Sequence, residues 1–365
     1  MKNTFGTNVL TTVFGESHGA AVGGVLDGLA PGIPVDRETI ERKLALRRPQ
    51  GAISTARVEG DKFEIVSGVF DGKTTGTPLC VLIPNENTRS GDYDAVRDLA
   101  RPGHADYTGF VKYHDFADYR GGGHFSGRVT AALVALGAVA GSALENRGIR
   151  IGTHISRLHG IPDRPFADLD ADITALSDRP FPVLDGAAAE KMQAAILAAK
   201  TDGDSVGGVL ETVVTGLPAG VGEPWFDSLE GLLSHGLFSI PGVKGVEFGD
   251  GFALSDLLGS EANDAFVPAN GTVATATNRN GGINGGISNG MPLLFRCAVK
   301  PTPSISLPQK TVNLHTGEAS DIAIPGRHDP AIVHRARAVV DAVTSLVLCD
   351  ALATRFGTDW LGGNK

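Results

Sequence analysis

The chain has 365 residues, of which 42% are hydrophobic and 20% charged, and a formal net charge of -9. This acidic balance disfavours nucleic acid as a partner, because no basic surplus is present to neutralise phosphates. The three cysteines lack metal-binding spacing, which disfavours a disulfide framework or a zinc site and favours a reducing compartment. The N-terminus has no signal-peptide core, and the most apolar run, 129–144, is too rich in Ala and Gly for a membrane span. We therefore expect a cytoplasmic globular protein without a bound metal.

Short strands and helices alternate along the chain. The expected elements, in order, are strands 8–14 and 22–26, a helix capped by Asp36 that runs to Leu46, strands 62–69 and 78–83, a helix from about 129 to 146, strand 151–159, helix 187–200, strand 205–215, helix 228–238, strand 293–299 and a last helix that reaches about 356. Asp227 and Glu230 have the spacing of a capping box for the helix at 228–238. The segment 161–185 is rich in Pro and Asp and gives little indication of its secondary structure.

Two short sequences recur about half a chain apart. Val22-Gly-Gly-Val-Leu26 returns as Val206-Gly-Gly-Val-Leu210, and Gly76-Thr-Pro-Leu79 resembles Gly290-Met-Pro-Leu293. Two matches in the same order indicate a duplicated fold with its site between the halves. We expect an α+β protein with layers around one large core, one domain over 1–365 made of pseudo-repeated halves at about 1–185 and 186–365, and Gly-rich loops that converge on one site.

The stretch from Arg101 to Arg128 is the first candidate for a site. It holds three arginines, three histidines and six glycines immediately before an apolar helix. An anion-binding loop needs both arginine and glycine, because glycine lets backbone N–H groups approach a phosphate and arginine binds the phosphate by charge. His104 follows Arg101 across a Pro-Gly turn, so it is either an acid beside an anion clamp or an ordinary loop histidine bonded to Asp106.

Three other patterns each allow two interpretations. Gly15-Glu-Ser-His-Gly19 matches the nucleophile elbow of hydrolases, with Ser17 as nucleophile, but only one strand precedes it, and a plain turn also explains the glycines. Asp329 precedes Pro330 and suits a helix N-cap, which residue types favour over a site role beside Arg327. The glycine-rich region 278–304 suits either a wide hairpin or a loop against a phosphate-bearing cofactor, and it lacks the G-x-G-x-x-G pattern.

Seven segments in this order resemble the chorismate synthase family. They are Phe14-Gly-Glu-Ser-His-Gly19, Arg47-Arg-Pro49, Arg101-Pro-Gly-His-Ala-Asp106, Tyr119-Arg-Gly-Gly-Gly123, Gly281-Gly-Ile-Asn-Gly-Gly-Ile-Ser288, Lys300-Pro-Thr-Pro-Ser304 and Gly326-Arg-His-Asp-Pro330. Each motif alone is modest, but seven in sequence order are highly specific. The resemblance covers nearly the whole chain.

The resemblance implies a phosphate lyase of the shikimate pathway, at the last common step to aromatic amino acids. Such an enzyme converts 5-enolpyruvylshikimate 3-phosphate to chorismate and phosphate by an anti 1,4-elimination, which requires reduced FMN although there is no net redox change. It further implies a layered β-α-β sandwich with internal pseudo-symmetry and a homotetramer, with a small-molecule substrate and neither nucleic acid nor membrane as partner. Reduced FMN is expected from an external reductant.

Roles for individual residues also follow from the resemblance. His18 would protonate the departing phosphate, His104 would stabilise or protonate the flavin, and Asp329 would assist proton removal through the flavin N5. The implied substrate-binding residues are Ser17, Arg47, Arg48, Arg101, Arg128 and Arg327. The implied FMN-binding residues are His124, Phe125, Ser126, Pro241, Gly242, Gly285, Lys300, Pro301, Thr302, Pro303, Ser304 and Arg327.

The chain departs from the family pattern at two places. Many members read Arg-Ser-Ser-Ala-Arg-Glu-Thr where this chain has His124-Phe-Ser-Gly-Arg-Val-Thr130, and Ile53 stands where an arginine is common. The first departure removes a flavin-side arginine of the family pattern and so affects the expected flavin affinity. The second removes an arginine expected to contact a nicotinamide cofactor (NADP). The alternatives to the lyase are a Ser17 hydrolase and a non-catalytic regulator that binds flavin or an anion without turnover.

Overall fold

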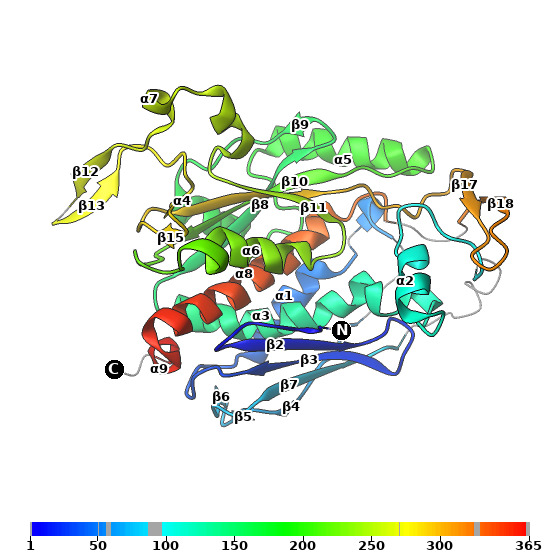
Figure 1. Cartoon of the computed structure of the whole chain (residues 1–365), viewed down its shortest axis with the longest axis horizontal. Coiled ribbons are helices and arrows are strands. Elements are labelled where there is room, and N and C mark those ends of the chain that lie inside the picture. The colour runs from blue at the N-terminus through cyan, green and yellow to red at the C-terminus, as the bar shows by residue number, and fades with distance from the viewer. Residues whose placement is uncertain are drawn as a thin grey trace.

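Two antiparallel sheets enclose a layer of helices in the computed structural model (Figure 1), which describes residues 2–49, 51–55, 60–86, 97–269, 271–324 and 329–362. The first sheet has the strand order β1 (Thr4–Phe5), β2 (Leu10–Gly15), β3 (Ala21–Asp27), β7 (Leu79–Pro84), β4 (Glu64–Ser67). The second has the order β11 (Val243–Phe248), β16 (Leu293–Val299), β10 (Gly208–Thr215), β8 (Arg150–Leu158), β9 (Ile161–Pro162). The fold is therefore α+β, as predicted.

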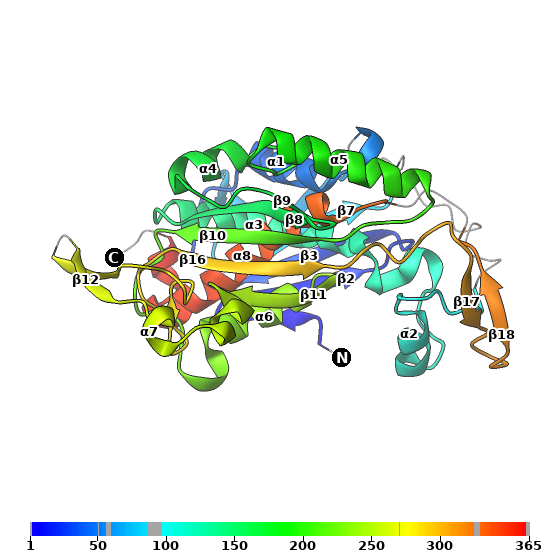
Figure 2. The same ribbon diagram turned by 90° about the horizontal axis from the view of Figure 1, so that it is seen from above.

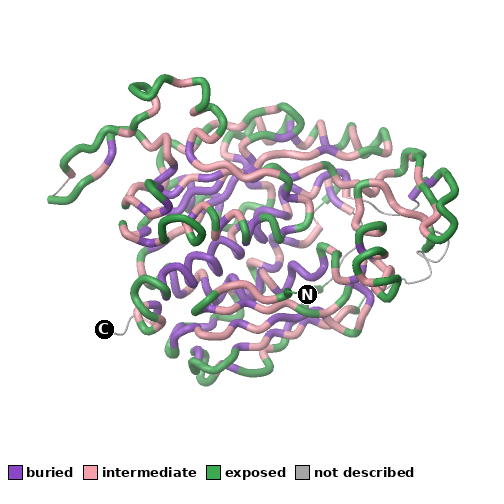
Figure 3. The backbone as a smooth tube through the Cα atoms, in the orientation of Figure 1, coloured by how far each residue is buried: buried purple, intermediate pink, exposed green. Residues whose placement is uncertain are grey.

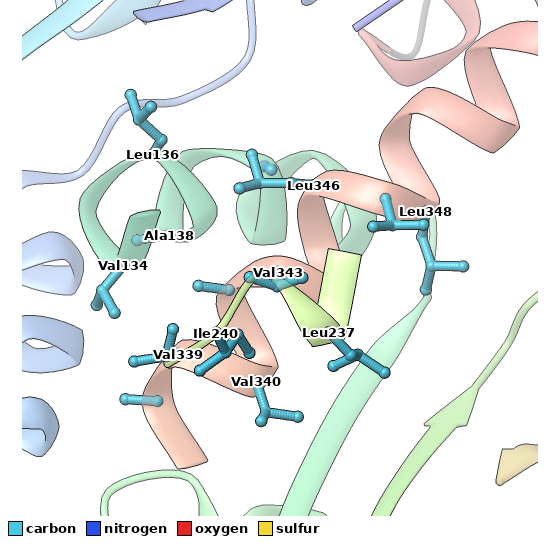
Figure 4. Packing of buried hydrophobic residues seen from close by; sticks show 14 of the residues in the cluster. Val134, Leu136, Ala138, Leu237, Ile240, Val339, Val340, Val343, Leu346 and Leu348 are labelled. Atoms are coloured by element: carbon cyan, nitrogen blue, oxygen red, sulfur yellow. The ribbon is translucent and has the colours of Figure 1, made fainter. Parts of the chain in front are cut away.

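The middle layer consists of four helices that bury their apolar faces against both sheets (Figure 1). They are α1 (Arg37–Arg47), α3 (Thr130–Glu145), α6 (Leu229–Phe238) and α8 (Val333–Phe356). Small residues let α3 and α8 approach closely, since a Cβ on Gly137 would lie 2.4 Å from Ala342 Cβ. Around this contact, valines and leucines of both helices interdigitate with Leu237 and Ile240 (Figure 4). This packing makes the helix layer the core of the molecule.

One segment of this layer, Gly127–Glu145, is long and apolar enough to cross a membrane by composition, with a mean hydropathy of 1.5. Inside the protein 78% of it is buried. Figure 3 shows the same distribution, with buried backbone concentrated in the helix layer and on the facing strands. The segment is thus accounted for as a core helix of this fold.

The remaining elements lie outside the sandwich. α4 (Leu169–Leu176) and α5 (Gly186–Thr201) lie beside the second sheet, next to β8 and β9 (Figure 2), and an arm extends away from the body. The arm contains η6 (Gly251–Asp256), α7 (Gly259–Ala262), β12 (Phe266–Ala269) and β13 (Thr272–Thr275). The other elements are η1 (Gly51–Ile53), β5 (Val69–Phe70), β6 (Lys73–Thr74), α2 (Asp106–Tyr113), η3 (Arg120–Phe125), η4 (Gly127–Val129), η5 (Trp225–Asp227), β14 (Ile283–Asn284), β15 (Ile287–Ser288), β17 (Gln309–Val312), β18 (Ala319–Ile322) and α9 (Thr358–Leu361).

Local signals predicted most elements, with instructive exceptions. Asp36 caps α1 as expected, because its carboxylate accepts the N–H groups of Glu38 and Thr39. The predicted capping box of Asp227 and Glu230 is wrong. The N-cap of α6 is Ser228, whose Oγ accepts the N–H of Gly231 at 3.0 Å.

Candidate active site

A cavity of about 1050 Å³ opens at one end of the helix layer. Its walls come from α1, η3, α6, α8 and the segment 300–304, so both halves of the chain contribute. Nine lysines and arginines line it against five aspartates, in a chain whose net charge is -9. The cavity is therefore a local cationic site in an acidic protein, which is the arrangement that a multiply charged anionic ligand requires.

Arginines predicted to bind substrate meet around an aspartate that the sequence did not single out. Arg47 Nη2 lies 3.1 Å from Asp61 Oδ2, Arg48 Nε lies 3.6 Å from the same oxygen, and Arg128 Nη1 pairs with Oδ1. Burial opposes ionisation of Asp61, but the charges of Arg47 and Arg128 together outweigh it, so the pKa of Asp61 is lowered. The cluster of Arg47, Arg48, Arg128 and Asp61 carries a net positive charge and is called the arginine cluster below.

A second cation is held in the turn 101–106. Arg101 makes a two-point ion pair with Asp106, with Nε–Oδ2 and Nη2–Oδ1 distances of 2.7 Å each. Burial opposes ionisation of Asp106, but the hydrogen bonds and charge of Arg101 lower its pKa overall. The N–H of His104 donates to the Arg101 carbonyl at 3.1 Å, so the Pro-Gly turn does bring the two residues together.

The turn 101–106 is docked against the segment 300–304. His104 Nε2 is hydrogen-bonded to Ser304 Oγ at 2.8 Å, and Lys300 Nζ donates to the Gly103 carbonyl at 2.6 Å. Gly103 also packs closely on Pro303, which a Cβ at position 103 would approach to 2.9 Å. Two segments about 200 residues apart in sequence therefore form one wall of the cavity, with His104 at their junction.

The glycine loop of η3, which lines the cavity, packs directly against Ser17 and His18. Gly121, Gly122 and Gly123 have φ angles of 61°, 81° and 53°, a left-handed run that glycine adopts without strain. A Cβ on Gly121 would lie 2.6 Å from His18 Nε2 and 2.9 Å from Ser17 Oγ. Both residues are buried, with exposures of 8% for His18 and 1% for Ser17, next to this glycine.

The geometry around Ser17 does not support a nucleophile elbow. Its Oγ is buried and makes no hydrogen bond within the described parts of the chain. A serine nucleophile needs a base within hydrogen-bond reach, and none of the described residues provides one for Ser17.

Asp329 is not the N-cap of the last helix, so that prediction is wrong. α8 begins at Val333 with Ile332 as its N-cap residue. Asp329 instead accepts the N–H of Thr55 at 2.9 Å and pairs with Arg335, whose Nε donates to the Arg47 carbonyl at 2.7 Å. The carboxylate of Asp329 is thereby connected to the arginine cluster and lines the cavity.

Comparison with known proteins identifies the family. A family model described as chorismate synthase matches residues 9–353. The chain belongs to the chorismate synthase family.

Full-length relatives agree with this assignment. Chorismate synthase of Dehalococcoides mccartyi is 48% identical over 360 residues, 98% of this chain and 98% of the relative. That of Methanocella arvoryzae is 46% identical over 351 residues, 96% and 94% of the two chains. A crystal structure of chorismate synthase matches with a TM-score of 0.74 at 27% identity and covers 97% of this chain and 94% of the other.

As a chorismate synthase family member, the chain is a lyase of the shikimate pathway. It converts 5-enolpyruvylshikimate 3-phosphate to chorismate, the last common step of aromatic amino acid biosynthesis. The family is flavin-dependent. This activity excludes the Ser17 hydrolase and the regulator without turnover, and it agrees with the absence of a base beside Ser17 among the described residues.

The structure brings most of the predicted site residues to one cavity. The lining includes Arg47, Arg48, Arg101, His104, His124, Phe125, Ser126, Arg128, Pro241, Gly242, Lys300, Pro301, Thr302, Pro303, Ser304 and Asp329. Ser17 and His18 are next to Gly121, itself a lining residue, and Gly285 is exposed in the turn between β14 and β15, outside this lining. Arg327 lies outside the described residues.

Sequence reasoning missed Asp61 and Arg335. Neither lies in a recognised motif, and each contacts its partners only after folding, since Asp61 pairs with Arg128 across 67 positions. Among the described residues, no group of three His, Cys, Asp or Glu side chains is placed to hold a metal ion.

Proposed function

We propose that the cavity is the site where 5-enolpyruvylshikimate 3-phosphate loses its phosphate, with reduced FMN as cofactor. The observation that carries this proposal is the excess of lysine and arginine in the lining of a cavity in an acidic protein. The substrate has one phosphate and two carboxylates, and guanidinium groups bind such oxyanions through paired, charge-assisted hydrogen bonds. Arg47, Arg48, Arg128 and Arg101 would bind it, with Arg327 and Ser17 as further contacts.

The lining also fits a flavin mononucleotide. A cavity of about 1050 Å³ exceeds the volume that one drug-sized ligand needs, so it can hold cofactor and substrate together. Thr302 Oγ1 is buried without a hydrogen-bond partner in the described chain, which is a polar atom for a ligand to satisfy. His124–Ser126, Pro241–Gly242 and Lys300–Ser304 would hold the cofactor, with Gly285 and Arg327 as the remaining candidates from the sequence.

Reduced FMN, when bound, supplies electron density to the elimination without being consumed. The residues of the chain provide the proton chemistry around it. We assign His18 as the acid for the departing phosphate, His104 as a proton donor on the flavin side and Asp329 as the group that assists removal of the C6 proton. His104 is oriented by Ser304, and Asp329 by Thr55 and Arg335.

The source of reduced FMN would be an external reductant. Ile53, the last residue of η1, packs against the apolar core and offers no charge to a nicotinamide phosphate, whereas Arg48 remains at the cavity. We also propose a cytoplasmic homotetramer. Exposed Phe252 and Phe266 on the arm, 81% and 69% accessible, are typical of surfaces that an assembly covers, and sedimentation as a particle smaller than four chains would contradict this state.

Titration with FMN under anaerobic conditions tests the assigned flavin wall. Lys300→Met removes a cation from the cavity and a bond to Gly103, and we expect the Kd for FMN to rise about tenfold. Lys310→Met is the matched control, because Lys310 is an exposed lysine paired with Asp321 at 2.8 Å outside the cavity. If both variants bind FMN like the wild type, the segment 300–304 is not part of the flavin site.

A further inference from the structure

Asp61 contacts three arginines at once, and all of them line the cavity together with it. Its side chain is 0% exposed, and those of Arg47 and Arg128 are 9% and 5% exposed. Breaking a buried charge pair from one side leaves the other charge without compensation. Loss of the Asp61 charge would therefore leave the buried guanidinium groups of Arg47 and Arg128 without this compensation.

The residues of the cluster come from separate parts of the fold. Arg47 and Arg48 lie at the end of α1, Arg128 lies in η4 before α3, and Asp61 lies in the loop before β4. Arg128 is further held by Asn85 Oδ1 at 2.9 Å from Nε and by the Pro84 carbonyl at 3.1 Å from Nη2. Asp61 is the group that these elements share.

The backbone at Asp61 is also unusual. Its φ angle of 46° lies in the left-handed region, which a non-glycine residue adopts only at a cost. Such strain persists where the surroundings determine the conformation, and it clusters at functional sites. At this position the surroundings include the three guanidinium groups that contact the carboxylate.

We propose that Asp61 is a positioning residue of the substrate site. Its carboxylate holds Arg47, Arg48 and Arg128 together against their mutual repulsion, so that a cluster of net positive charge is assembled before the anionic substrate binds. Such preorganisation lowers the cost of ordering flexible side chains during binding. The inference rests on the proposed assignment of this cavity as the substrate site.

Asp61→Asn removes the charge of the side chain and keeps its volume. The amide keeps the size of the carboxylate but cannot balance three guanidinium groups, so the arginines are expected to separate. The carboxylates of the substrate keep their charge during the elimination, so a cluster that binds them should show the loss mainly in KM. We expect KM to rise about tenfold or more and kcat to change less than about threefold.

The matched control is Asp172→Asn. Asp172 is a buried aspartate on α4 that pairs with an arginine, Arg164 Nη1, at 3.0 Å, away from the cavity. Anaerobic steady-state kinetics and thermal melting of both variants separate positioning from stability, since a purely structural aspartate changes the melting temperature without changing KM. A KM of Asp61→Asn within about twofold of the wild type would overturn the proposal.

Two further measurements keep the test decisive. If Asp61→Asn does not fold, Asp61→Glu is the second variant, because it keeps the charge and moves it by one methylene. Asp61→Glu should fold and show a raised KM. Failure of both variants to fold overturns the proposal, because Asp61 would then serve folding. If the wild type and Asp172→Asn show no turnover, the function assignment fails instead. Calorimetric titration with the substrate then tests Asp61 separately, and an unchanged Kd in Asp61→Asn overturns its role.

Discussion

At the scale of single residues, the cavity joins groups whose relation is visible only in the folded chain. The motifs predicted His18, His104, Asp329 and the arginines because each belongs to a short, recognisable segment. Asp61 carries no such signal, since an aspartate in a loop is ordinary in composition and its partners Arg47, Arg48 and Arg128 lie elsewhere in the sequence. Residue types alone also favoured a cap at Asp329, because the sequence does not show that Thr55 and Arg335 compete for its carboxylate.

Gly121 controls the position of His18. In Gly121→Ala, the new Cβ would lie 2.6 Å from His18 Nε2, so the imidazole must move, and we expect kcat to fall about 10- to 100-fold. The control is Gly148→Ala, which has a similar φ of 75° and no heavy atom within 4 Å of the added Cβ. Both variants should lose about 1 kcal/mol of stability from the left-handed backbone, and equal activity in the two would contradict the placement of His18.

Asp329→Asn tests whether this carboxylate serves the reaction or the fold. The amide oxygen can still accept the N–H of Thr55, but the base and the charge opposite Arg335 are lost. We expect kcat to fall about 100-fold or more with a small change in melting temperature. Asp250→Asn, which loses a partly exposed pair with Arg279 outside the cavity, is the control. Normal activity with a lowered melting temperature would show a structural role.

At the scale of elements, helices and strands with local signals were predictable. The sequence predicted α1 because the cap and the apolar periodicity of this helix are local signals, whereas it did not predict α4 or the arm. The arm is stabilised by side chains such as Asp264, whose pKa is lowered to about 2; burial opposes this shift, but hydrogen bonds from Thr277 and Asn280 outweigh it. Sequence periodicity does not record bonds of this kind.

The first turn of α8 makes stability depend on pH. His334 is buried against Ser54 Oγ at 2.9 Å, and burial, with a smaller effect of Arg335, lowers its pKa to about 4 against an opposing effect of Asp329. Between pH 6.5 and 4 the unfolded chain therefore binds a proton that the folded chain does not. Stability should fall as the pH is lowered through this window, by up to about 3 kcal/mol.

Urea unfolding at pH 7 and pH 5 measures this effect. His334→Gln removes the titrating group, so its stability should depend less on pH than that of the wild type. His159→Asn is the control, because His159 is exposed and asparagine tolerates its left-handed φ of 47°. Equal pH dependence in the wild type and His334→Gln would refute the assignment to His334.

At the scale of the whole molecule, we propose that the two sheets are products of one duplicated unit. The order β2-β3-β7-β4 in one sheet corresponds to β8-β10-β16-β11 in the other, with α3 equivalent to α8. The repeated sequence at 22–26 lies in β3, and its counterpart at 206–210 leads into the equivalent strand β10. This correspondence places the division between α3 and β8 instead of near residue 185. Superposition of the two units tests it, and it fails if α3 does not fall on α8.

We propose that this chain forms chorismate in the cationic cavity with reduced FMN. The most direct measurement is an anaerobic assay of the wild-type protein with 5-enolpyruvylshikimate 3-phosphate and photoreduced FMN. We predict equal amounts of chorismate and phosphate with reduced FMN, and no product with oxidised FMN alone. Absence of chorismate while the flavin remains reduced would contradict the account.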